Sequence, residues 1–251
     1  MNNSPKISII TIVYNDVKHL EGTIHSVINQ TYNNLEYIII DGGSKDDTLE
    51  IIKKFQSKLA YWVSEPDKGI YDAMNKGLRT ATGDYVLFLN SGDRLYHNEI
   101  FQQLFDSKAE TLPDVIYGET MIVAEDGAEI GLRRLKAPEQ LTWKSLSEGM
   151  LVCHQSFLAK RNIAPYYDLN YHYSADYDWM IKVLKNAKSI VNARQIVAAF
   201  LDGGTSKKNI RNSLLERFSI MSKNYGFVTT ALHHIVIGFR FWVFYLKNKR
   251  F

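Results

Sequence analysis

The sequence predicts an α/β protein with a mostly parallel central sheet, helices on both faces of that sheet, a mixed-sheet second half and helices at the C-terminus. Two observations favour this fold class. Apolar runs that are typical of buried strands alternate with helix-like segments over the first 95 residues, and this order builds a parallel sheet through right-handed crossovers. The run at 85–89 has no polar face, so we expect both of its faces to be covered.

The elements of the first half follow in order. Ile7 to Val13 is predicted as a strand, and Asn15 or Asp16 can cap a helix over about 17–28 whose apolar residues fall on one face. The other predicted elements of this half are strands at 35–40, 61–63 and 85–89 and helices around 49–55 and 70–81.

The pattern changes after residue 93. Residues 115–117 and 120–123 are predicted strands, and an Asp126-Gly127 turn leads to a return strand at 130–132. Such a hairpin predicts that the second half of the sheet is mixed. Further helices are predicted at 175–186 and 210–225 from their apolar spacing.

The composition is that of an ordinary globular protein, with 251 residues, 45% hydrophobic and 23% charged. The single cysteine, Cys153, excludes an internal disulfide. The first six residues lead directly into a predicted strand, without the apolar segment of a signal peptide. We therefore expect a cytoplasmic protein in a reducing setting.

Charge is strongly segregated along the chain. Residues 207–251 carry nine Lys/Arg and one acidic residue, Glu216, a net charge of +8, which leaves −5 for residues 1–206 of the total of +3. A basic tail predicts contact with phosphates or with an anionic membrane surface. The acidic body argues against nucleic-acid binding.

The segment 227–246 is apolar and aromatic, with Arg240 as its only formal charge. Its length approaches the ~20 residues needed to span a bilayer. However, Arg240, His233 and His234 would be costly at mid-depth, which favours an interfacial helix at the inner face of the cell membrane. A helix that docks on the protein's own core or on a dimer partner is the alternative. We expect one domain over 1–206, with halves 1–95 and 96–206, and a helical extension over 207–251.

Polar residues follow each predicted strand of the first half, where the carboxyl ends of parallel strands form a crevice. They predict a nucleotide site with an aromatic ring for a base, carboxylates for hydroxyls or a metal, and Lys68 for phosphate. Taken alone, the motif at 41–44 fits simple turn chemistry equally well. The four strand endings are Tyr14-Asn15, Asp41-Gly42-Gly43-Ser44, Glu65-Pro66-Asp67-Lys68-Gly69 and Asn90-Ser91-Gly92-Asp93.

Five motifs within residues 6–95, in the same order, resemble the inverting glycosyltransferases of family 2. The resemblance implies a GT-A fold with a Rossmann-like sheet, a nucleotide-diphospho-sugar donor, a divalent metal (Mg²⁺ or Mn²⁺), and sugar transfer with inversion. The motifs are Ile9-Ile10-Thr11-Ile12-Val13-Tyr14-Asn15, Gln30-Thr31-Tyr32, Ile39-Ile40-Asp41-Gly42-Gly43-Ser44-Lys45-Asp46-Asp47-Thr48, Asp67-Lys68-Gly69-Ile70-Tyr71-Asp72-Ala73-Met74-Asn75-Lys76-Gly77 and Leu89-Asn90-Ser91-Gly92-Asp93.

The resemblance assigns donor-side roles to single residues. Tyr14 and Asp41 correspond to positions that hold the nucleoside, and Asn75 lies in the family's Ala-x-Asn-x-Gly helix below the donor. Lys68 and Asn90 complete the predicted donor site. Asp93 corresponds to the metal ligand at the end of the family's acidic turn.

Two departures from the family pattern bear on the donor. Gly42 stands where many members have an Asp that reads uracil. Asn90 and Gly92 stand where the metal turn usually has its earlier acids, which leaves Asp93 as the only carboxylate of that turn. A UDP-sugar is the first expectation for the donor, and GDP- and dTDP-sugars remain alternatives.

The second half is expected to supply the acceptor side and a base. The segment 173–179 resembles the family's Glu-Asp segment, with Asp176 in the place of the base and Ala175 in that of the Glu. Asp176 at a helix start also fits a simple N-terminal charge that stabilises the helix. His154-Gln155 and residues 203–206 resemble positions near the acceptor cleft, although a His-Gln pair is also common in cores.

The expected reaction needs no enzyme nucleophile. A metal and Lys68 would disperse the charge that develops on the leaving diphosphate, and Asp176 would accept the proton of the attacking hydroxyl. With the basic tail, the resemblance implies a polyprenyl-diphosphate-linked glycan acceptor in bacterial surface-polysaccharide assembly (O-antigen, capsule or exopolysaccharide).

Three other classes of protein share parts of this pattern. A dinucleotide oxidoreductase is disfavoured because no G-x-G-x-x-G follows the first strand. A sugar nucleotidyltransferase would carry a glycine- and basic-rich triphosphate loop near its N-terminus. A non-catalytic sugar-nucleotide-binding protein that lost acids at positions 42, 92 and 175 is the remaining alternative.

Overall fold

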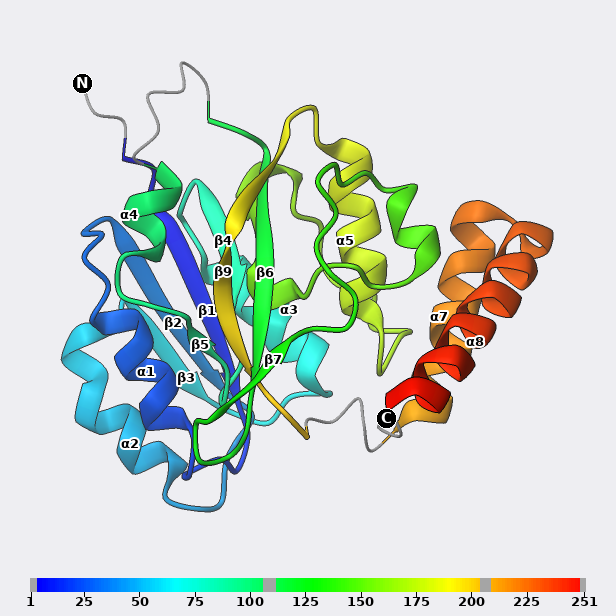
Figure 1. Ribbon diagram of the computed structural model, residues 1–251. Coiled ribbons are helices and arrows are strands. Elements are labelled where there is room, and N and C mark those ends of the chain that lie inside the picture. The colour runs from blue at the N-terminus through cyan, green and yellow to red at the C-terminus, as the bar shows by residue number, and fades with distance from the viewer. Residues whose placement is uncertain (1–3, 106–111, 204–208, 249–251) are drawn as a thin grey trace.

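The computed structural model describes residues 4–105, 112–203 and 209–248 (Figure 1). Within these residues the strands form one nine-stranded sheet with the order β3-β2-β1-β4-β8-β6-β9-β5, and β7 pairs with β6. Helices cover both faces of the sheet, and two further helices stand at one side of the molecule. The predicted α/β architecture is confirmed.

The first half of the sheet is parallel, as predicted. Strand β1 (Ile7–Val13) lies between β2 (Leu35–Asp41) and β4 (Tyr85–Phe88), and β2 pairs with β3 (Tyr61–Ser64). Val13 is in register with Asp41, which in turn is in register with Ser64. The carboxyl ends of these strands therefore meet at one edge, and the loops that follow them are neighbours.

The second half is mixed. Strand β6 (Val115–Val123) pairs antiparallel with β7 (Glu129–Leu132) and β8 (Phe157–Lys160) and parallel with β9 (Ile190–Leu201). Strand β8 returns antiparallel to β4, and the short β5 (Arg94–Leu95) pairs with β9.

The sequence pattern did not predict β5, β8 or β9. Asn192, Arg194 and Gln195 interrupt the apolar run of β9. The register of β9 with β6 shifts in this stretch, where Arg194 has a φ of 53°. Periodicity detects a strand only over an uninterrupted run, so β9 depends on its pairing with β6.

Alternate residues of β1 pack on opposite faces of the sheet. Ile9 contacts the cluster that contains Leu20 and Ile24 of α1 (Leu20–Ile28), and Ile10 contacts the cluster with Met74 of α3. The helices of the first face are α1, α2 (Thr48–Phe55) and α4 (Ile100–Phe105), and those of the second are α3 (Ile70–Thr80) and α5 (Ala175–Asn186). Short 3₁₀ turns cover Gln56–Lys58, Ser145–Glu148, His154–Ser156 and Arg161–Ile163.

Gly77 shows how closely α3 approaches the sheet. A Cβ atom at this position would lie 2.3 Å from Cγ2 of Ile10 in β1. Only glycine allows this separation, so Gly77 permits the close packing of α3 on β1.

The predicted start of the first helix is wrong. Helix α1 begins at Leu20 with His19 in the N-cap position, rather than after a cap at Asn15 or Asp16. The carboxylate of Asp16 instead accepts a hydrogen bond from Ser91 Oγ (2.7 Å) and pairs with Nδ1 of His19 (2.5 Å). The Asp16 carboxylate is thus engaged by other side chains, Ser91 of the β4 loop among them, and does not cap the helix.

The C-terminal extension forms two helices, α7 (Ile210–Tyr225) and α8 (Phe227–Asn248), with Gly226 between them at a φ of 87°. They stand beside α5 (Figure 1). Within the described residues, no helix combines the length and apolarity required to cross a membrane. The side chain of Arg240, residues 204–206 of the predicted acceptor motif and the basic residues 249–250 lie outside the described residues.

Candidate active site

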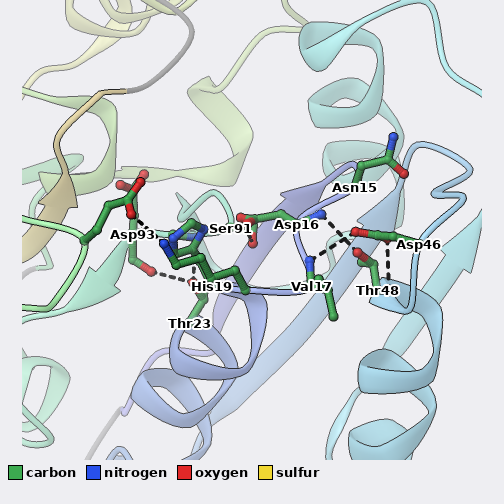
Figure 2. Close-up of polar contacts among 12 residues, drawn as sticks. Asn15, Asp16, Val17, His19, Thr23, Asp46, Thr48, Ser91 and Asp93 are labelled. Atoms are coloured by element: carbon green, nitrogen blue, oxygen red, sulfur yellow. Dashed lines mark hydrogen bonds and ion pairs between the residues drawn. The ribbon is translucent and has the colours of Figure 1, made fainter.

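The loop after β1 is bonded both to the start of α2 and to the loop after β4 (Figure 2). The Asp16 backbone N–H donates to Thr48 Oγ1 (3.0 Å), while the Asp16 carboxylate holds Ser91 of the β4 loop. Thr23 of α1 donates through Oγ1 to the backbone oxygen of Asp93 (2.8 Å). These contacts fix the turn 90–93 against the first helix, so its side chains have a defined position.

Asp41 lies at the predicted strand end and is fully buried. Its carboxylate accepts hydrogen bonds from the Ser44 backbone N–H (3.0 Å), the Ser44 hydroxyl and Ser64 Oγ (2.5 Å). Asp41 therefore organises the loop after β2 and ties it to β3. Its contact with a nucleoside stays a prediction.

Tyr14 and Asp67 face each other across Gly42. The Tyr14 side chain is 60% exposed. A Cβ atom at Gly42 would lie 2.6 Å from Oδ2 of Asp67 and 3.3 Å from Cδ2 of Tyr14, whereas Oδ1 of Asp67 accepts the Gly69 N–H (2.9 Å). The carboxylate of Asp67 thus takes the space that a side chain at position 42 would need. Lys68, which is exposed, follows Asp67 and lies two residues before the start of α3.

Asn75 is buried in α3, and its side-chain amide is engaged by one partner. Nδ2 donates to the Tyr167 backbone oxygen (2.9 Å), and Oδ1 accepts the Tyr167 backbone N–H (2.7 Å). Asn75 therefore joins α3 to the loop before α5. Any effect of Asn75 on the donor would therefore act through the position of this loop.

Asp93 is 4% exposed, and its carboxylate meets residues from the second half of the chain. Gln155 Nε2 donates to Oδ2 (2.6 Å), and the Leu201 backbone N–H donates to Oδ1 (3.1 Å). Burial raises the pKa of Asp93 to about 6. Gln155, predicted near the acceptor, thus contacts the turn predicted to bind metal.

The Asn90–Asp93 turn fits a divalent cation that is held by few protein oxygens. Oδ1 of Asn90 is buried and has no hydrogen-bond partner among the described residues. Each carboxylate oxygen of Asp93 keeps a second lone pair. Over the described parts of the chain, no group of three or more His, Cys, Asp or Glu side chains could enclose a metal. Mg²⁺-type ions commonly take one or two protein ligands and complete their shell with substrate phosphates, which this oxygen set allows.

Asp176 lies in the first turn of α5, and its side chain is 14% exposed. Oδ1 accepts hydrogen bonds from the Tyr71 hydroxyl (3.2 Å) and the Tyr177 backbone N–H (2.9 Å). Nδ1 of His154 donates to Oδ2 (3.3 Å), and Nε2 of His154 accepts from Nδ2 of Asn90 (3.3 Å). His154 therefore bridges the predicted base and the predicted metal turn.

The pKa of Asp176 is set by opposing effects. Burial raises it, but the hydrogen bond from His154 and the charge of Arg217 hold the pKa of Asp176 below its usual value. The group is thus ionised at neutral pH and can accept a proton from a hydroxyl bound beside it.

Three contributors to the site were not predicted. Tyr71 lies in the 67–77 motif that carries the family resemblance, so its hydroxyl could have been identified as a site group from the sequence. Arg217 and Glu216 come from α7; Glu216 accepts the backbone N–H groups of residues 172–174. The only signal for Glu216 was its isolation as the single acid in a basic segment.

Comparison with known proteins gives consistent results for sequence and structure. The sequence model of the family "Glycosyl transferase family 2" matches residues 8–164. Over 260 residues the chain is 31% identical to the Mycobacterium tuberculosis glycosyltransferase Rv1514c, covering all of this chain and 96% of that protein. A Mycobacterium bovis protein named PGL/p-HBAD biosynthesis glycosyltransferase is 29% identical over 88% of this chain and 86% of its own length.

Solved structures share the fold at low identity. Residues 1–349 of Staphylococcus aureus TarS in complex with UDP-GlcNAc superpose with a TM-score of 0.67 at 20% identity, over 79% of this chain. The match spans 59% of that fragment's length. The mannosyltransferase PcManGT from Pyrobaculum calidifontis, in complex with GDP-Man and Mn²⁺, superposes with a TM-score of 0.63 at 15% identity, over 93% of this chain and 75% of that one.

Proposed function

The chain belongs to glycosyl transferase family 2, with a GT-A fold, and we propose that this glycosyltransferase moves a sugar from a nucleotide-diphospho-sugar to a hydroxyl of a glycan acceptor with inversion of anomeric configuration. One observation carries the proposal. Asp176, an ionised and partly exposed carboxylate, is joined through His154 to the Asn90–Asp93 turn. A base and a candidate metal-binding turn that share one hydrogen-bond network match a single displacement at the anomeric carbon.

On the donor side, Tyr14 and Lys68 are proposed to contact the nucleotide directly, because both side chains are exposed beside the strand ends. Asp41 and Asn75 shape the loops around it, since their polar groups are already paired. Asn90 and Asp93 would hold a Mg²⁺ or Mn²⁺ ion, which when bound stabilises negative charge on the leaving diphosphate.

The nucleotide is proposed to be UDP. One structural neighbour binds UDP-GlcNAc and another GDP-Man, so both nucleotides occur in this fold. Asp67 places a hydrogen-bond acceptor beside the Tyr14 ring, and the imide N–H of uracil is a suitable donor to it. GDP- and dTDP-sugars, whose bases also carry ring N–H donors, are the alternatives to test.

In the transfer step, the acceptor oxygen bonds to the anomeric carbon while the bond to the nucleoside diphosphate breaks. Asp176 accepts the proton of the attacking hydroxyl, and the diphosphate leaves with the electron pair. His154 keeps Asp176 oriented and ionised during this step. Tyr71, on the other carboxylate oxygen, restricts the rotation of the base.

We propose a lipid-linked acceptor, such as a polyprenyl-diphosphate-linked glycan in O-antigen, capsule or exopolysaccharide assembly. Residues 1–206 would act as the catalytic domain at the cytoplasmic face of the membrane, with 207–251 as a peripheral anchor. The +8 charge of the extension supports this proposal.

The proposal is tested with a panel of UDP-, GDP- and dTDP-sugars, each with and without Mn²⁺ or Mg²⁺. We expect one nucleotide class to raise the melting temperature only when metal is present, and Asp93→Ala to abolish that metal-dependent shift. An unchanged metal titration in Asp93→Ala would refute the assignment of Asp93 as a metal ligand.

Turnover separates this function from its alternatives. A non-catalytic binding protein would show the thermal shift without release of nucleotide under any condition. A sugar nucleotidyltransferase would instead form a nucleotide-sugar and pyrophosphate from a nucleoside triphosphate and a sugar 1-phosphate. Either outcome would replace the proposed transfer reaction.

A further inference from the structure

Glu216 of α7 holds the segment that leads into the proposed base. Its carboxylate accepts three consecutive backbone N–H groups, from His172 (2.7 Å), Tyr173 (2.8 Å) and Ser174 (2.9 Å). Asp176 follows two residues later. Hydrogen bonds to a charged group are the strong ones in proteins, so the position of α7 sets where α5, and with it Asp176, begins.

Other contacts tie the same segment to the same helix. The Ser174 hydroxyl lies 3.2 Å from the Ser213 backbone oxygen and 3.1 Å from the Ser213 hydroxyl. Lys223 Nζ donates to the Tyr171 hydroxyl (2.7 Å). Four consecutive residues before the base, 171–174, are thus bonded to α7, so a displacement of this helix would displace the base.

The outer side of the two helices has a different character. Apolar side chains that are about half exposed or more lie on α7 and the first turns of α8. The two helices stand at one side of the molecule, beside α5 (Figure 1). The most exposed of these side chains are Ile210, Leu215, Phe227, Val228, Leu232 and Ile235.

Charge identifies what this surface fits. The extension has nine basic residues and a single acid, and that acid, Glu216, has a side-chain exposure of only 18% because it is bonded to residues 172–174. The extension therefore combines exposed apolar side chains with a net positive charge, and its single acid is engaged by residues 172–174. Apolar burial together with attraction to anionic headgroups is how interfacial helices bind membranes.

We propose that α7 and α8 form a docking surface for an anionic lipid bilayer, and that Glu216 is a positioning residue through which this docking orders the segment 171–174 and the base Asp176. The inference rests on the proposed role of Asp176 and extends it. Lipid contact on the outer side of α7 stabilises the segment 171–174, which the inner side of α7 holds in place. Transfer is then faster on a membrane than in free solution.

The docking surface is tested on the full chain with vesicles of phosphatidylcholine, with and without phosphatidylglycerol. We expect co-sedimentation with the anionic vesicles, weakened by salt. Val228→Asp should reduce it, and Ile130→Asp, which changes an exposed apolar residue of β7 instead, should not. Equal binding to neutral and anionic vesicles would overturn the lipid assignment.

The coupling is tested by hydrogen exchange at the amides of 172–174, which needs no enzymatic activity. In Glu216→Gln we expect these amides to exchange about tenfold faster or more, and anionic vesicles to protect them in the wild type but not in the variant. Glu50→Gln, a surface change on α2, is the matched control. If Glu216→Gln does not fold, Glu216→Asp is measured in the same way.

Kinetics complete the test. Glu216→Gln should lower kcat by about 10²-fold, the scale expected for a misplaced catalytic group, with an unchanged KM for the donor. Unchanged exchange at 172–174 in folded Glu216→Gln, or an equal loss of donor affinity, would overturn the coupling. Because exchange and sedimentation do not depend on sugar transfer, their failure is distinct from a failure of the proposed reaction.

Discussion

The two sides of the site are held in different ways. In the nucleotide loops after β1 and β2, side chains are fixed by neighbours in the same loop or on the adjacent strand, as when Asp41 binds Ser44 and Ser64. On the base side, Asp176 is held by Tyr71, 105 residues earlier, and by His154, while Glu216 holds the segment before it. Local motifs thus build the loops after β1 and β2, whereas long-range contacts hold the base and also Asn75 and Asp93 of the donor side.

This difference predicts which substitutions should disturb residues beyond the substituted position. A substitution in a donor loop disturbs a motif that carries its own hydrogen bonds. A substitution on the base side disturbs a carboxylate that depends on three separate elements, α3, the 3₁₀ turn at 154–156 and α7. We therefore expect base-side changes to affect turnover more than donor binding.

The largest effect is expected for Asp176→Asn. Loss of a positioned base typically costs ~10²–10⁴-fold in rate, and donor affinity should be retained because Asp176 lies outside the donor loops. Calorimetric donor titration and turnover measure the two separately. Asp178→Asn, which removes the neighbouring acid paired with Lys182 (2.6 Å), should keep turnover per folded molecule. Wild-type turnover in Asp176→Asn would remove Asp176 as the base.

His154→Ala should come next, with kcat reduced by about 10- to 100-fold because the base loses its orienting partner. Donation from His154 holds the pKa of Asp176 down, so its loss raises that pKa. Activity requires the ionised base, so the acid limb of the pH–rate profile should move to higher pH. His25→Gln, at an exposed position of α1, is the control. An unmoved acid limb would separate His154 from the base.

The donor side should show its own pH dependence. Because the pKa of Asp93 is raised to about 6 by burial, protons compete with metal below that pH. Metal-dependent donor affinity should then fall by up to about tenfold per pH unit, a limit set by one proton. Titrations at several pH values measure this, and a flat profile in the wild type would contradict it.

The same shift has the opposite effect on stability without ligand. Between its usual pKa and about 6, Asp93 binds a proton in the folded state that the unfolded chain does not bind. The contribution of Asp93 to the free energy of unfolding should therefore increase as the pH falls through that range. Asp93→Asn, compared with the wild type by denaturant unfolding, isolates this contribution.

The smallest functional effect is expected for Asn75→Ala. The change leaves the buried N–H and C=O of Tyr167 unpaired, which costs ~1–3 kcal/mol in free energy of unfolding. Donor affinity should change little, since the amide is bonded within the protein. Asn33→Ala, at an exposed position, should stay within about 0.5 kcal/mol. A large loss of donor affinity at full stability would instead place Asn75 in contact with the donor.

Much of the fold could be predicted because apolar periodicity is a local property. Strands β1 to β4 and helices α5 and α7 lie where their patterns indicate. The pattern failed where tertiary contacts decide: Asp16 binds Ser91 instead of capping α1, and β9, with polar residues at its centre, is a strand because β6 pairs with it.

The sequence by itself determined the α/β class, the family resemblance of residues 6–95 and the identity of the acids at positions 93 and 176, because these depend on order and spacing along the chain. Only the tertiary structure decided that Gln155 binds Asp93, that His154 joins Asn90 to Asp176, and that Glu216 of the extension holds the base segment. These partners are 22 to 64 residues apart, and their meeting depends on how the second half of the sheet pairs. Spacing along the chain encodes a local motif, whereas a contact at such separation is created by packing.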